Sequence, residues 1–260
     1  MAKKPKPAPL KLPNPINSNA SLNAEHTIYL AGTGGGKTSA VYHMELIPKG
    51  AQVVIFDPYQ GYANNMLKGQ KVLGVKSRVA FVKALVIARR TGKPFKLAYI
   101  PAMGACEDEL EFFSAVVWSV GNGKAAKLHT VIEDLASCVE VSGKLRGKAG
   151  ELLRGGRQFG LVIHTLFQKA QEVPKTVTDQ SDRWWVGKVN SGRDANWVSR
   201  EREIPLTDIT SLVSAKENKE RIGKPIAEYL LITTFGKADK GAFNCSTGQQ
   251  VPLNYASKSM

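Results

Sequence analysis

A glycine-rich segment of the chain, residues 32–38, carries the residue types that bind phosphate groups. It reads Gly32, Thr33, Gly34, Gly35, Gly36, Lys37 and Thr38, and it lies between an apolar run, 27–31, and a stretch of helical character, 38–46. In that context glycine N–H groups can surround phosphate oxygens, and the helix N-terminus adds partial positive charge. Lys37 would reach the β- and γ-phosphates, and the Thr38 hydroxyl would ligate Mg²⁺. The segment predicts a site for ATP or another nucleoside triphosphate.

Ala31 occupies the first position of the usual pattern, G-x-x-x-x-G-K-[ST], where glycine is more common. We call residues 31–38 the phosphate loop. The alternative interpretation is a flexible hairpin turn. Such turns rarely end in Gly-Lys-Thr at the start of a helix, so the phosphate site is favoured.

Two acids, Glu133 and Asp134, directly follow the apolar segment 128–132. A phosphate loop needs a carboxylate on a neighbouring strand to hold Mg²⁺, and a group that orients the attacking water. The two acids match this Walker B arrangement in reversed order, since Asp commonly precedes Glu. We assign Glu133 to the magnesium ion and Asp134 to the water. The alternative for Asp134 is a helix cap after a core strand.

Gln168 follows a further apolar run that begins at Leu161. An amide at the end of such a strand could sense the γ-phosphate or the attacking water, although a polar residue after a strand is often only part of a loop. Trp184 and Trp185 lie in an apolar run, so packing in the core or at a subunit interface is favoured over base stacking. His129 and His164 lie within strands at no ligand-like spacing, and we expect core histidines.

The chain is strongly basic. Its 260 residues include 36 Lys and Arg against 22 Asp and Glu, a net charge of +14. Residues 1–25 contribute only +3, from four lysines and Glu25, which leaves +11 on the rest of the chain. This balance favours a polyanionic partner, either nucleic acid or an anionic membrane surface, and solubility is the alternative reason for it.

Cysteine usage and hydropathy narrow the class of protein further. Cys106, Cys138 and Cys245 are scattered and lack Cys-x-x-Cys spacing, which indicates a reducing compartment without a disulfide framework or zinc site. No apolar run reaches the roughly 18 residues of a transmembrane helix. Prolines replace the apolar stretch that an N-terminal secretion signal would need. These features predict an intracellular, soluble protein.

The chain is expected to have three parts. Residues 1–24, with five prolines and four lysines, predict a disordered arm. Residues 25–235 predict one P-loop ATPase domain, in which 216–224 is a solvated helix end or loop. The polar residues 236–260 predict an extension that packs on a neighbouring subunit or frays.

Within the domain, short apolar runs alternate with helical stretches, which is typical of an α/β fold with a mostly parallel, helix-covered sheet. The expected strands are 27–31, 53–56, 95–100, 128–133, 161–164, 184–189 and 229–233, and the expected helices are 38–46, 79–91, 107–120, 144–157 and 194–202.

The order of these parts resembles the FtsK–HerA superfamily of DNA-pumping ATPases, and within it the genome-packaging ATPases of tailless, membrane-containing viruses. The resemblance covers roughly residues 26–200. Besides the phosphate loop and Glu133-Asp134, it rests on the Gly-Arg-x-x-Gly run 156–160, on the strand that leads to Gln168, and on Val-Pro-Lys at 173–175. The chain departs from the family at Ala31, in the reversed acids, and in having Gln-Lys-Ala at 168–170 instead of Gln-Arg-Pro.

The resemblance implies a RecA-like P-loop NTPase fold and a homo-oligomeric ring, such as a hexamer, with ATP bound between subunits. An arginine of the neighbouring subunit would then reach the γ-phosphate. Arg157 is our first candidate, Arg154 the second and Arg193 the third, and for each the alternative is a solvated surface residue. The basic stretch 144–157 would line a pore and touch DNA phosphates, or would form an ordinary solvated helix face.

The function implied is that of an ATP-driven translocase that packages a double-stranded viral genome into a preformed capsid. Its partners would be double-stranded DNA and a capsid vertex or viral membrane proteins, in the host cytoplasm during assembly or at the virion vertex. Two other hypotheses are an ATPase that acts on protein during phage assembly or export, and a switch or DNA-binding scaffold that holds nucleotide without turnover.

Overall fold

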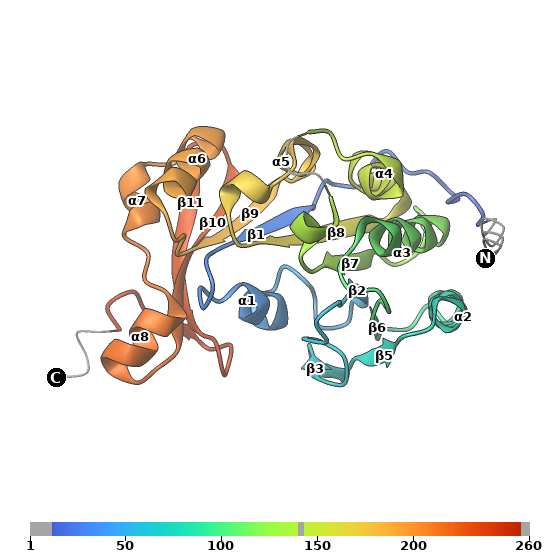
Figure 1. Cartoon of the computed structure of the whole chain (residues 1–260), viewed down its shortest axis with the longest axis horizontal. Helices are drawn as coiled ribbons and strands as arrows, with labels where there is room; N and C mark the ends of the chain where they lie inside the picture. The colour runs from blue at the N-terminus through green and yellow to red at the C-terminus, as the bar shows by residue number, and fades with distance from the viewer. Residues whose placement is uncertain (1–11, 140–142, 256–260) are drawn as a thin grey trace, which may run out of the picture.

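The computed structural model describes residues 12–139 and 143–255 (Figure 1). In this part of the chain a ten-stranded sheet has the order β12-β11-β10-β9-β1-β8-β7-β2-β6-β5. In that order the strands are Gln250–Val251, Lys237–Asn244, Ile226–Thr234, Arg183–Gly187, Thr27–Leu30, Leu161–Phe167, Leu128–Ile132, Gln52–Phe56, Phe95–Tyr99 and Leu73–Val75. Neighbours from β9 to β5 are parallel, whereas β10, β11 and β12 are antiparallel to the strand before them.

Two apolar cores lie on the two faces of the sheet, because successive side chains of a strand point to opposite faces. On β1, Ile28 and Leu30 belong to one core and Tyr29 belongs to the other. The first core packs against α2 (Arg78–Arg90), α3 (Glu107–Ser119), α4 (Gly147–Gly155), α5 (Lys175–Gln180), α6 (Gly192–Arg202) and α7 (Leu206–Thr210). The second packs against α1 (Lys37–His43), α8 (Ala215–Ile222) and the segment that leads into the hairpin β3 (Met66–Leu67) and β4 (Gln70–Lys71). Figure 1 shows α1 and α8 on the opposite side of the sheet from α3 to α7.

The predicted α/β architecture, a mostly parallel sheet covered by helices, is confirmed. β8 continues to Phe167, three residues beyond its predicted end, because residues 165–167 are also buried between the two faces. The helix predicted over 144–157 is shorter. It spans 147–155 and gives way to a 3₁₀ turn, η2 (Gly156–Phe159), at a pair of glycines, which are weak helix formers.

The region after β9 differs most from its prediction. Residues 237–244, expected to form part of a polar extension, are strand β11, and 250–251 are strand β12. Ala242 and Phe243 are buried on opposite faces of the sheet, whereas the other side chains of β11 are exposed or half-buried. Most of residues 216–224, expected as a helix end or loop, belong to helix α8, which spans 215–222. A capping box between Ser214 and Glu217 starts that helix by satisfying backbone N–H groups that have no partner within it.

The described part of the N-terminal segment, residues 12–25, lies along the body of the domain. Ile16 forms a parallel bridge to Asn122, and the N–H of Asn19 donates to the carbonyl of Gln158 at 2.8 Å. Residues 1–11 of the predicted arm lie outside the described residues. Within the described ranges, none of the helices combines the length and apolar character needed to cross a bilayer.

Candidate nucleotide-binding site

The phosphate loop connects the end of β1 to the start of α1. Gly34 and Gly36 adopt left-handed conformations, with φ of 75° and 93°, which side chains disfavour. A Cβ atom on Gly36 would lie only 2.8 Å from the Cβ of Ala227, so close packing also requires glycine at this position. The N–H of Gly35 donates to the carbonyl of Gly32 at 3.0 Å. The result is a tight turn directly before a helix N-terminus, which can hold an anion.

Ala31 replaces glycine at the first position of the loop without strain. Its backbone does not have the positive φ that would require glycine, and its side chain is fully buried. The space for its methyl group comes from two glycines, because a Cβ atom on Gly35 or Gly187 would lie 2.7 or 3.0 Å from the Cβ of Ala31. The departure from the usual pattern is therefore compensated locally.

The ammonium group of Lys37 folds back onto the phosphate loop. Its Nζ donates to the carbonyl of Ala31 at 2.6 Å and to that of Gly32 at 3.2 Å. Burial lowers the pKa of Lys37 to about 8, against the opposing influence of Glu133 and Glu172. A buried cation held only by neutral carbonyls is poorly compensated, so an incoming triphosphate would supply the charge that it lacks.

Glu133 lies at the end of β7, close enough to Lys37 for each to affect the pKa of the other. Burial raises the pKa of this carboxyl group, while a hydrogen bond from the Tyr62 hydroxyl to Oε2, 2.9 Å, and the charge of Lys37 oppose the rise. The carboxylate is thus held in a fixed place at the same edge of the sheet as the phosphate loop.

Asp134 has a left-handed backbone conformation, with φ of 55°, which turns the chain sharply after β7. Its carboxylate accepts a short hydrogen bond from Tyr59, and it lines a cavity of about 290 Å³ together with Gln168 and Glu172. Gln168 also reaches the phosphate loop, because Oε1 accepts a hydrogen bond from the hydroxyl of Thr33 at 3.1 Å. The structure therefore brings together the acid and the amide that the sequence nominated.

One expectation about this arrangement is wrong. β7, which carries the acids, is not the neighbour of β1, because β8 lies between them and pairs with both. All three strands are parallel, so their carboxyl ends meet at one edge. Gln168, at the end of the middle strand, is consequently placed between the phosphate loop and the acidic pair.

Sequence reasoning missed Asp57, which directly follows β2. The side chain is fully buried, and its two oxygens accept from the N–H groups of Gly61, Tyr62 and Ala63 at 2.8, 3.1 and 2.9 Å. Residues 58–63 contain both tyrosines that bond the acidic pair. Asp57 therefore holds the loop that positions Glu133 and Asp134. The available signal was a buried strand ending in Asp-Pro.

The donors at this site fit Mg²⁺, which prefers hard oxygen ligands and retains several waters. Thr38, a partly exposed residue at the start of α1, offers its hydroxyl. In Glu133, Tyr62 occupies only Oε2. Across residues 12–139 and 143–255 no group of three or more acidic, histidine or cysteine side chains forms a ready-made cage. Thr38 and Glu133 would therefore hold the ion together with phosphate oxygens and water, as is usual for magnesium in nucleotide sites.

Two of the nominated arginines, Arg157 and Arg154, lie apart from this site, whereas Arg193 lies at the same edge of the sheet. Arg157, in η2 before β8, donates to the carbonyls of Ala20 and Leu22 at 3.0 and 2.5 Å. Arg154 donates to the carbonyl of Leu145 at 2.8 Å. Both precede β8, which spans about 20 Å for seven residues, and so lie at the opposite edge of the sheet from Gln168. Arg193 is exposed at the start of α6, beyond the carboxyl end of β9.

The aromatic and histidine pairs belong to the core. Trp184 and Trp185 are fully buried on opposite faces of the sheet. His129 and His164, on neighbouring strands, are hydrogen-bonded through ring nitrogens at 3.0 Å, and burial lowers the pKa of both. The core interpretation of these residues is confirmed.

Comparison with solved structures connects this geometry to known proteins. The genome packaging NTPase B204 from Sulfolobus turreted icosahedral virus 2, in complex with ATP-gammaS, matches with a TM-score of 0.60 over 84% of this chain and 98% of B204, at 14% identity. The chain has the P-loop NTPase fold. The bacterial conjugative coupling protein TrwBdeltaN70 matches with a TM-score of 0.55, over 89% of this chain and 88% of TrwB, at 10% identity.

Sequence comparison gives a more modest result. No family model matches the chain. Protein P9 of Pseudoalteromonas phage PM2 is 25% identical over 193 residues, which cover 73% of this chain and 79% of P9. Together with the structural neighbours, this confirms the predicted resemblance to the FtsK–HerA superfamily and to viral genome-packaging ATPases.

Proposed function

We propose that this protein is a Mg²⁺- and ATP-dependent motor that packages double-stranded DNA into a preformed viral capsid. The observation that carries the proposal is the meeting of Lys37, Glu133 and Gln168 at one edge of a sheet with the B204 fold. These groups have the chemistry needed to bind a triphosphate and to orient water at its terminal phosphate. B204, whose described function is genome packaging, is matched over almost its whole length.

In this proposal each residue has one task. The phosphate loop and Lys37 bind the triphosphate, and Thr38 and Glu133 hold Mg²⁺, which would neutralise charge on the phosphates. Asp134 accepts the proton of the attacking water, and Gln168 orients that water. Because Gln168 is also bonded to Thr33, it can respond to whether the phosphate loop is filled.

The DNA part of the proposal is supported by charge. A body charge of +11 suits a partner that is recognised through its phosphates rather than its base sequence. We propose a homo-oligomeric ring, such as a hexamer, whose basic residues around α4 face DNA, with a capsid vertex or viral membrane protein as docking partner in the host cytoplasm.

ATP hydrolysis with and without duplex DNA tests this function. The parent protein should hydrolyse ATP faster with DNA, and added salt should reduce the stimulation steeply as phosphate contacts are lost. Lys37→Ala should abolish turnover, and Asp134→Asn should lower it by about 10²–10⁴ while nucleotide still binds. ATP binding without hydrolysis in the parent would indicate a switch, and hydrolysis that responds to a protein partner but never to DNA would indicate an assembly ATPase.

A further inference from the structure

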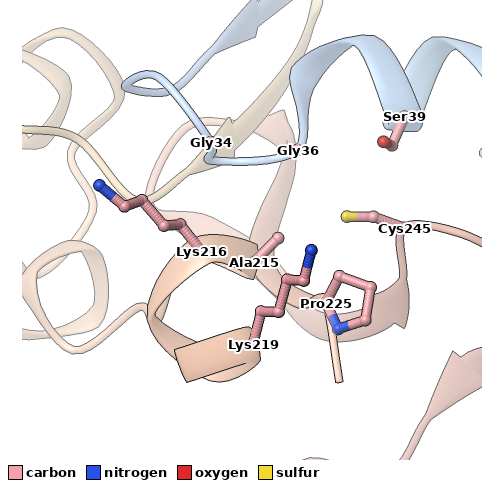
Figure 2. A pocket seen from close by; sticks show the side chains of 8 residues that line it. All are labelled: Gly34, Gly36, Ser39, Ala215, Lys216, Lys219, Pro225 and Cys245. Atoms are coloured by element: carbon pink, nitrogen blue, oxygen red, sulfur yellow. The ribbon is translucent and has the colours of Figure 1, made fainter. Parts of the chain in front are cut away.

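A second cavity, of about 280 Å³, lies beside the phosphate loop on the side away from the acidic pair. Figure 2 shows that the loop forms one wall and α8 the facing wall, with Pro225 and Cys245 closing an end. The N–H of Lys216 donates to the carbonyl of Gly34 at 3.3 Å, which ties the start of α8 to the loop. Because Gly34 and Gly36 of the phosphate loop line the cavity, it adjoins the proposed phosphate site.

The order of strands gives a triphosphate a direction across the loop. β8 and β7, on one side of β1, end in Gln168 and Glu133, which act on the terminal phosphate in the proposed function. β9, β10 and β11 lie on the other side of β1, and Cys245 directly follows β11. With the terminal phosphate on the first side, a triphosphate that extends across the loop carries its nucleoside to the second side, where this cavity lies.

We propose that the cavity between the phosphate loop, α8 and Cys245 receives the ribose and base of a nucleoside triphosphate. The proposal rests on the function proposed above and extends it to residues outside the phosphate loop. Ala215, Pro225 and the Cys245 thiol provide weakly polar surface against which a planar base can pack. The ammonium group of Lys219 points into the cavity toward Gly36, where it can offset phosphate charge nearest the ribose (Figure 2).

Cys245 provides a direct readout of occupancy. Its thiol is only partly buried and lies 3.2 Å from the position that a Cβ atom on Gly36 would take. A bound nucleoside should cover this thiol. Alkylation by N-ethylmaleimide, followed residue by residue by mass spectrometry, should slow about tenfold at Cys245 when ATP is present at ten times its Kd. Cys106, also partly exposed but located at the start of α3, should react at an unchanged rate.

Inorganic tripolyphosphate distinguishes binding at the phosphate loop from binding in the cavity. At a concentration that saturates the loop, confirmed by displacement of a fluorescent ATP analogue, it should leave alkylation of Cys245 nearly unchanged because it has no nucleoside. Equal protection by tripolyphosphate and ATP would overturn the proposal, since it would place the phosphates, or a closure of the loop, over the thiol. If ATP binds without protecting Cys245, the proposal about the cavity is overturned and the proposed function is unaffected. Failure of ATP to bind at all would instead reject the proposed function.

Two matched variants provide a test that does not need the thiol. Lys219→Glu places a negative charge in the cavity and should weaken ATP binding about tenfold or more, by repulsion of the phosphates. Lys224→Glu makes the same change two residues beyond α8, at an exposed position that does not line the cavity. It should change the Kd by less than about twofold, because exposed charges are screened. Equal losses in the two variants would show a general charge effect and no role for the cavity.

Discussion

The carboxyl ends of the parallel strands form one edge of the sheet, the carboxyl edge, and their amino ends form the opposite one, the amino edge. The two differ in which groups bond their charged side chains. At the carboxyl edge, Lys37 donates only to carbonyls of its own loop, and Glu133 and Asp134 each accept from a tyrosine. At the amino edge, Arg157 fastens the N-terminal segment through its carbonyls, and Glu25 forms ion pairs with Lys127 and Arg183. At the carboxyl edge, the charged side chains can still interact with a ligand. At the amino edge, the charged side chains bond other parts of the same chain. The contrast suggests that the chemistry of one subunit is confined to one edge.

Arg157 is the residue through which the two edges would be connected between subunits. If it reaches the nucleotide of a neighbour, Arg157→Ala should keep ATP binding and lose about 10³-fold in turnover, since the charge developing in the transition state goes unmatched. Arg154→Ala is the comparison variant, because this arginine, our second candidate, also bonds a backbone carbonyl at the same edge. A larger loss of turnover in this variant would assign the role to Arg154 instead. Steady-state hydrolysis and nucleotide binding would be measured on both variants.

Mixing subunits of two variants distinguishes a catalytic role of Arg157 toward the neighbouring subunit from a structural role. Arg157→Ala subunits retain an intact phosphate loop, and Lys37→Ala subunits retain the arginine. Two inactive variants should therefore regain partial hydrolysis when they are mixed in one ring. If both assemble like the parent and the mixture stays inactive, Arg157 serves only to hold residues 20–22, and the amino edge has no part in catalysis.

The sequence was sufficient to nominate most of the side chains that the structure brings together at the carboxyl edge, because the proposed chemistry restricts residue type and spacing there. Gly36, Lys37 and Thr38 have few other uses in that order, and an apolar strand that ends in two acids is similarly specific. The order of strands could not be predicted, since it depends on pairing between distant segments. For that reason the insertion of β8 between β1 and β7 was missed.

Local polarity misled the prediction for residues 216–224 and for those after residue 235. β11 has only two fully buried side chains, Ala242 and Phe243, so its alternation was too weak to recognise before its partner β10 was known. α8 is polar along most of its length, and its capping box was overlooked. Asp57 was missed for another reason: its role depends on three N–H groups in the loop that follows, which no spacing rule specifies.

A variant of Asp57 tests whether turnover at the carboxyl edge depends on the ordered loop 58–63. Asp57→Asn leaves one oxygen to serve three N–H donors, so the variant should lose about 2–3 kcal/mol in free energy of unfolding, measured in urea. Turnover should fall with kcat rather than KM, because Tyr59 and Tyr62 would no longer fix the acids. Ser18→Ala removes an exposed hydrogen bond to Gln158 at the amino edge and should cost less than about 1 kcal/mol. Equal costs would mean that the two edges are equally ordered.

At the amino edge, His26 should make the stability of the fold sensitive to acid. His26 precedes β1 and is buried. Its Nδ1 accepts from the N–H of Ile163 at 3.1 Å, and its Nε2 lies 3.1 Å from the carbonyl of Leu153, to which it donates. Burial lowers the pKa of His26 to about 4, so the ring is neutral in the folded protein at pH 7. Protonation of Nδ1 would remove the acceptor that Ile163 uses.

The direction of the effect follows from proton binding. Below its ordinary pKa, near 6.5, this histidine binds a proton more readily in the unfolded chain than in the folded one, so stability is lost as the pH falls from 6.5 toward 4. Between pH 7 and pH 5 the loss from His26 alone should be about 2 kcal/mol. His26→Gln removes the proton-binding group, so it should flatten the pH dependence of urea unfolding even though it lowers stability at pH 7. An unchanged slope would assign acid sensitivity to His129 and His164 in the centre of the sheet, and the amino edge would then be no more acid-sensitive than the carboxyl edge.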